Sequence, residues 1–104
     1  MSNKTLLQGI FPEDVERLIR VEHPDPHGIL GVHPHAGKEE GIVIRSFHPE
    51  AIRAEVLIDG KDPLPMEKCH PGGLFACFVA RQSLPVHYRI RFIFSDGNHW
   101  ESIA

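Results

Sequence analysis

The sequence predicts an all-β fold, an antiparallel β-sandwich with one short N-terminal helix. From residue 41 onward, short apolar segments recur about every eight to twelve residues, and Gly, Pro, Asp or Asn separates them. The clearest segments alternate apolar and polar side chains, which is typical of a strand with one buried face. Because such a face must be covered, we expect two sheets packed against each other.

A short helix is expected over about residues 12–20. Pro12 suits the first helical position, and the acidic residues that follow it favour the positive end of the helix dipole. The apolar residues of this segment fall on a single stripe, which comprises Phe11, Val15, Leu18 and Ile19. The helix should therefore pack on a sheet by that face.

Residues 22–35 are interpreted as a structured connector between the helix and the strands. Three prolines and two glycines lie within residues 23–34 and fix the backbone too irregularly for a regular element. Five or six strands should follow, at about residues 41–47, 52–58, 64–70, 74–80, 86–94 and from residue 98. Pro65 places the third of these strands at a sheet edge, because proline lacks a backbone donor.

Length and charge limit the classes of protein that fit. The 104 residues suit one domain, with residues 1–10 loosely held and residues 11–104 forming a single β-sandwich module. The 11 basic and 14 acidic residues are mixed along the chain, which argues against a nucleic-acid binder. The chain has neither a membrane-spanning apolar run nor a secretory signal, so we expect a cytoplasmic protein with no membrane partner.

The two cysteines are expected to be reduced. Cys69 and Cys77 flank a turn at residues 70–73, and a hairpin there would set them diagonally, which is poor disulfide geometry. Cys69 and His70 do not form a convincing nucleophilic pair either, because neighbours on a strand point to opposite faces.

The histidines raise the question of a metal site. Four of the eight lie in or next to the connector, namely His23, His27, His33 and His35. A zinc site needs three or four ligands brought to one point, and prolines and glycines separate these residues irregularly. We therefore expect histidines that hydrogen-bond the backbone, and neither a metal nor another cofactor.

Residues 13–20 followed by residues 22–33, with the segment His-Pro-Asp-Pro-His-Gly-Ile-Leu-Gly-Val-His, resemble the opening of bacterial glycogen branching enzymes. Further similar segments follow in the same order, at residues 43–49, 65–67, 70–75 and 88–92. The resemblance covers roughly residues 12–100. Each segment is short, and their common order makes the resemblance specific.

This resemblance implies an immunoglobulin-like β-sandwich that precedes the catalytic barrel of the longer branching enzymes. Those enzymes resemble retaining glycosidases, which need two carboxylates about 5 to 5.5 Å apart. In the family these carboxylates lie on barrel strands, and a barrel takes at least about 200 residues. We therefore expect no transferase activity from this chain alone. The ending Glu101-Ser-Ile-Ala104 departs from the family's usual Asp-Pro-Tyr, so a piece cut at a domain border and a natural stand-alone module both fit.

A weak α-glucan site is one candidate for the function of this surface. Sugars stack on exposed aromatic rings and hydrogen-bond planar polar groups, and Trp100 is the best platform, with Asp96, Asn98 and His99 beside it. The alternative for Trp100, and the commoner role of such a residue, is a cap over the open end of the sandwich or against a neighbouring domain.

A second candidate surface comprises His87, Arg89 and Arg91, which share the polar face of the clearest strand. Such a face is usually solvated, and it can also contact a neighbouring domain.

The function that the resemblance implies is that of a non-catalytic N-terminal module of a 1,4-α-glucan branching enzyme of glycogen biosynthesis. It would position α-glucan or support the catalytic barrel, and so bias the length of the transferred chain. Two alternatives remain: a structural spacer between domains without affinity for sugar, and a stand-alone regulatory module that binds another glycogen-pathway protein.

Overall fold

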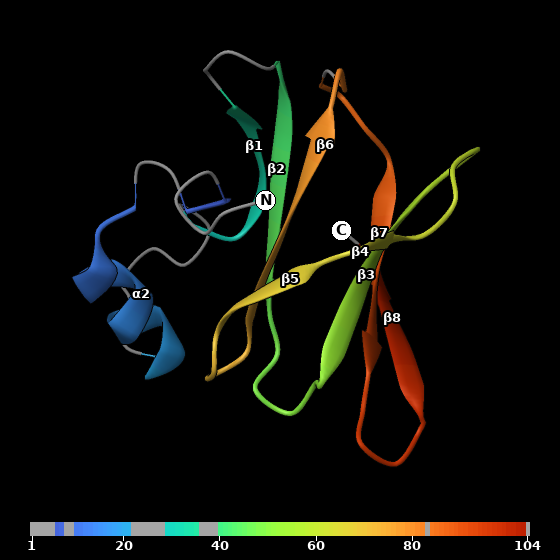
Figure 1. The fold of residues 1–104 in the computed structure, drawn as a ribbon. Helices are drawn as coiled ribbons and strands as arrows, with labels where there is room; N and C mark the ends of the chain where they lie inside the picture. The colour runs from blue at the N-terminus through green and yellow to red at the C-terminus, as the bar shows by residue number, and fades with distance from the viewer. Residues whose placement is uncertain (1–5, 8–9, 22–28, 36–39, 83, 104) are drawn as a thin grey trace.

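The computed structural model describes residues 6–7, 10–21, 29–35, 40–82 and 84–103. These residues form two antiparallel sheets that face each other, with a short helix outside one of them (Figure 1). The predicted all-β sandwich with one short N-terminal helix is thereby confirmed. No helix in the described ranges is long and apolar enough to span a membrane.

The two sheets have four strands each. In the first sheet the spatial order is β1 (Gly31–His35), β2 (Gly41–Phe47), β6 (Leu74–Ala80) and β5 (Glu67–His70). In the second sheet it is β4 (Leu64–Pro65), β3 (Arg53–Ile58), β7 (Tyr88–Ile93) and β8 (His99–Ile103). The chain crosses from the second sheet back to the first between β4 and β5.

The core between the sheets consists of the inward-facing side chains of both sheets, which alternate with outward-facing ones along each strand. Its most completely buried members include Ile42, Ile44, Val56 and Phe75. Phe75 of the first sheet meets Phe92 of the second edge to face, with ring centroids 6.3 Å apart. Burial of these side chains is the main stabilising contribution, at about 1.5–3 kcal/mol for each large apolar side chain.

The outer face of the first sheet is covered by the N-terminal part of the chain. Helix α2 (Pro12–Ile19) buries Val15 and Leu18 against Leu74 of β6, and Ile29 joins this cluster. Leu6 lies in the segment that was expected to be loosely held, yet it is 1% exposed and packs in a further cluster on this face. The helix lies on the side of the first sheet away from the second sheet (Figure 1).

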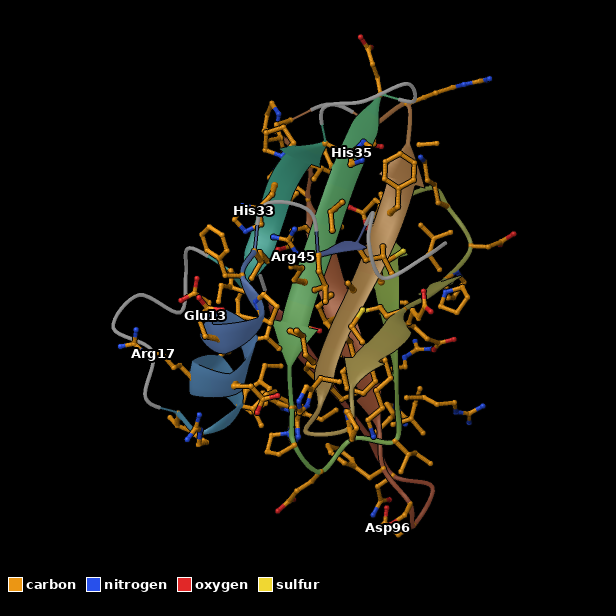
Figure 2. All side chains as sticks on the ribbon, turned by 60° about the vertical axis from the view of Figure 1, so that its left-hand side comes forward. Glu13, Arg17, His33, His35, Arg45 and Asp96 are labelled. Atoms are coloured by element: carbon orange, nitrogen blue, oxygen red, sulfur yellow. The ribbon has the colours of Figure 1, made fainter. Side chains whose placement is uncertain are left out.

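Arg45 is the one described charged residue that is buried, and it lies on this covered face (Figure 2). Its Nε donates a hydrogen bond to the carbonyl oxygen of Leu6 at 2.9 Å, and Nη1 donates to that of Ile29 at 3.3 Å. Burial lowers the pKa of its guanidinium, and these acceptors partly offset the lost hydration. Arg45 thus ties two segments of the N-terminal part to β2.

Several boundaries differ from the sequence-based expectation. The last residues of the predicted connector form β1, whose Pro34 is tolerated because β1 is an edge strand. The third predicted strand is split between β4 and β5, which lie in different sheets. Met66 lies between them, and its backbone N–H still reaches the carbonyl oxygen of Ala54 at 2.9 Å. The helix ends at Ile19 and the long strand spans only Tyr88–Ile93.

We expect Arg45→Met to lower the free energy of unfolding by about 2–3 kcal/mol, because two buried carbonyl oxygens lose a charged donor. Urea denaturation followed by circular dichroism measures this change. Arg17→Ala, at an exposed position of the helix, should change stability by less than about 0.5 kcal/mol. An Arg45→Met domain as stable as the parent would contradict the role given to this side chain.

Two turn glycines should respond differently to alanine. Both have positive φ, +110° at Gly73 and +80° at Gly60, but only at Gly73 would a Cβ collide with backbone, the carbonyl of His48. We expect Gly60→Ala to cost about 1–2 kcal/mol from backbone strain alone and Gly73→Ala to cost more, about 2–4 kcal/mol. Thermal unfolding of both variants tests the order, and equal losses would rule out the collision.

Candidate functional site

The outer face of the second sheet carries rows of side chains set by the strand register. In one row Arg53 of β3 pairs with Ile93 of β7, which pairs with His99 of β8. In the next row on the same face, the partners are Glu55, Arg91 and Glu101. No described helix covers this face, in contrast to the first sheet (Figure 1).

The second of these rows is a ladder of ion pairs centred on Arg91. Its Nη1 lies 3.5 Å from Glu55 Oε1 and its Nη2 lies 3.4 Å from Glu101 Oε2. Arg89 Nη1 lies 3.2 Å from Glu101 Oε1. These side chains are about one third to one half exposed, so each pair adds little stability. The ladder chiefly fixes the positions of the charged groups.

A groove with a volume of about 510 Å³ lies over the two rows. Its polar lining comprises Arg53, Glu55, Arg91 and His99, while Met66 and Ile93 contribute to its apolar lining. Among the described residues, Arg91 Nε is the one buried side-chain nitrogen or oxygen atom without a hydrogen-bond partner. The groove therefore combines hydrogen-bonding groups with apolar surface, the usual composition of a binding site.

Trp100 lies on the opposite face of β8 from this groove. It pairs with Phe92 across the strands, and the two rings are stacked, with centroids 6.1 Å apart and an angle of 18° between their planes. His48 meets Trp100 edge to face at 6.1 Å. The indole is nevertheless 54% exposed. Trp100 thus has features of both a cap and a sugar platform, because it packs at the margin of the core and also exposes ring surface.

The other residues predicted beside Trp100 are engaged or point elsewhere. Asp96 accepts hydrogen bonds from the backbone N–H and the side-chain amide of Asn98, both at 2.9 Å, and so closes the turn between β7 and β8. Figure 2 shows Asp96 at the tip of this hairpin, on the far side of the molecule from the helix. His99 lines the groove and therefore lies across the strand from Trp100.

The second predicted surface is partly an ion-pair network. Arg89 and Arg91 share the outer face of β7, as their alternation indicated, and both contact Glu101. His87 is exposed and precedes β7. Arg53 and Glu55 are not among the residues predicted from the sequence. Their alternation with inward residues of β3 was visible, but only the pairing of β3 with β7 brings them to Arg91.

The two described histidines of the predicted connector, His33 and His35, contact protein groups. His33 Nε2 lies 3.1 Å from the carbonyl oxygens of Ile29 and Leu30 and donates to them, as expected. The His35 ring packs against that of Phe78. Within the described ranges, no three His, Cys, Asp or Glu residues gather as a metal site would require. His23 and His27 lie outside the described residues, so the expectation of no metal stays a prediction.

The cysteines lie on opposite faces of the first sheet and are free. Cys77 belongs to the core between the sheets, whereas Cys69 packs on the outer face. Both nitrogens of His70 are engaged away from Cys69, since Nδ1 accepts from the Gly72 N–H at 2.8 Å and Nε2 donates to Glu16 at 2.8 Å. Burial raises the pKa of the Cys69 thiol to about 11. The arrangement does not activate a nucleophile.

The strand order defines the chain as a β-sandwich domain in which no described helix covers the outer face of the second sheet. The chain belongs to the family of N-terminal domains of branching enzymes. Residues 11–103 match the family model described as alpha-1,4-glucan branching enzyme GlgB, N-terminal domain. The resemblance seen in the sequence is thereby confirmed.

Curated relatives agree with this assignment. The chain is 39% identical over 85 residues to the 1,4-alpha-glucan branching enzyme GlgB of Frankia casuarinae, an alignment that covers 82% of this chain and 10% of that protein. For GlgB of Myxococcus xanthus the identity is 36% over 75 residues, covering 72% and 10%. For GlgB of Rubrobacter xylanophilus it is 33% over 90 residues, covering 86% and 12%. The chain thus spans about a tenth of the length of these relatives.

The raised thiol pKa predicts slow chemistry at Cys69. At pH 8 only about one Cys69 thiol in a thousand is ionised, and only the thiolate attacks a disulfide reagent. We expect both thiols to react with 5,5′-dithiobis(2-nitrobenzoate) at least about tenfold more slowly in the native domain than in urea. Equal rates in the two states would show that the thiols are accessible and ionised in the folded domain.

Proposed function

We propose that this chain acts as a non-catalytic module of a 1,4-α-glucan branching enzyme of glycogen biosynthesis. The module binds α-glucan weakly, helps to position it for the catalytic portion, and so biases the length of the transferred chain. Family membership supports the parent enzyme, and the exposed Trp100 supports a direct contact with sugar. The 104 residues are too few to include a barrel, which takes at least about 200.

The exposed indole of Trp100 is the single observation that carries the glucan contact. Sugar rings present C–H groups that pack on aromatic faces, so a fixed aromatic ring is a suitable platform. Phe92, itself 3% exposed, stacks on Trp100 and limits its rotation. Because the ring is already held, binding costs less conformational entropy than it would at a free side chain.

A contact with the remainder of the parent enzyme is the second candidate role. The ion-pair ladder on the outer face of the second sheet favours it, because Arg89 keeps about half of its side chain exposed beside Glu101. Interfaces between domains of one chain are often polar in this way. The partners in this proposal are therefore α-glucan and the other domains of the parent, in a cytoplasmic enzyme.

Trp100 is the only tryptophan, so its fluorescence reports this site alone. We expect maltoheptaose at millimolar concentration to change the emission saturably. In calorimetry, Trp100→Ala should weaken binding by about tenfold, since aromatic contacts are worth about 0.5–1.5 kcal/mol beyond their buried area. Phe11→Ala removes another exposed ring, on the helix side, and should bind like the parent.

The spacer alternative gives a different result. A domain with only that role would show neither a fluorescence change nor heat of binding with maltoheptaose or glycogen. Circular dichroism of Trp100→Ala ensures that lost binding does not reflect lost folding.

A further inference from the structure

We propose that the groove on the outer face of the second sheet is a second α-glucan subsite, distinct from the Trp100 platform. It would hold one or two sugar units by hydrogen bonds to their hydroxyl groups. This inference rests on the proposed function, because it takes its ligand class from the glucan role. The Trp100 platform does not include any residue of the groove, so the two sites can be tested separately.

The groove has unused hydrogen-bonding capacity. Arg53 lines it and is exposed, and its side chain makes no hydrogen bond or ion pair within the described part of the chain. The Nε of Arg91 also lacks a partner there, and its burial makes that unpaired donor costly. Because this atom is covered, the exposed Arg53 supplies the donors that a sugar hydroxyl can reach directly.

The mixture of charges suits a neutral ligand. Arg53, Arg91 and Glu55 line the groove, and Glu101 beside it pairs with both Arg91 and Arg89. Because both carboxylates stand next to arginines on this face, an anion meets opposing charge that an unopposed pair of arginines would not present. A sugar hydroxyl both donates and accepts, and it can therefore bond guanidinium and carboxylate groups side by side.

The size and apolar lining of the groove fit the same ligand. Its volume of about 510 Å³ falls within the range of ordinary small-molecule sites, which is about 300–1,000 Å³. Met66 and Ile93 contribute apolar surface, against which the C–H groups of a sugar ring can pack. Its described lining includes the imidazole of His99 but no Phe, Tyr or Trp, so hydroxyl contacts must supply most of the selectivity.

The two subsites flank one edge strand. His99 and Trp100 are successive residues of β8, and alternation along a strand sends them to opposite faces. His99 lines the groove, while Trp100 shares the face of Phe92. A substitution in the groove should therefore leave the tryptophan platform unchanged, and the reverse should also hold.

Titration of the 104-residue domain with maltoheptaose, followed by backbone amide shifts, tests this inference. We expect shifts at the groove residues that lie away from β8, namely residues 53–55 and Met66, in addition to the response of Trp100. Arg53→Ala should weaken the binding reported by the groove amides by about tenfold or more, as expected for a lost hydrogen bond to a charged group. It should leave the fluorescence response of Trp100 unaltered. Arg17→Ala, on the helix, is the matched control and should change neither.

The other outcomes show whether one, both or neither of the two proposals holds. A fluorescence response without shifts at the groove amides rejects the groove subsite and leaves the proposed function standing. Silence of both probes rejects both. Inorganic phosphate, titrated in parallel, should leave the groove amides unmoved, and tighter binding of phosphate than of maltoheptaose would identify an anion site instead. Groove shifts that persist in Trp100→Ala confirm that the two subsites are independent.

Discussion

The structure depends on an asymmetry in how its two sheets bury their faces. Both sheets bury one apolar face in the shared core, but among the described residues only the first sheet also has its outer face covered, by Leu6, Ile29 and helix α2. That second layer occupies the surface on which a ligand could otherwise bind. The outer face of the second sheet stays accessible, and it is there that the charged rows and the groove are found.

This division explains why the surface of the second sheet combines order with exposure. Its strands are held by the core beneath them, so outward side chains start from fixed backbone positions. The hydrogen bonds between Asp96 and Asn98 fix the hairpin that carries both His99 and Trp100. A weak ligand benefits from such a surface, because little conformational entropy is lost when it binds.

Much of the fold was predictable from local patterns, whereas the site was only partly so. Alternation along residues 86–94 indicated which side chains face inward, and turn residues marked most strand ends. Strand β1 was missed because its Pro and Gly content suggested a connector, and proline is acceptable there only because the strand lies at an edge. The meeting of Arg53, Glu55 and Arg91 depends on the pairing of distant strands, which no local pattern specifies.

The tie formed by Arg45 has a consequence for how such domains can diverge. Its two acceptors are main-chain oxygens, of Leu6 and Ile29, and every amino acid supplies that atom. These two hydrogen bonds therefore place no demand on which side chains occupy the two positions, provided that they remain apolar enough to pack. A relative could exchange both residues and keep both hydrogen bonds, so long as an arginine persists on β2.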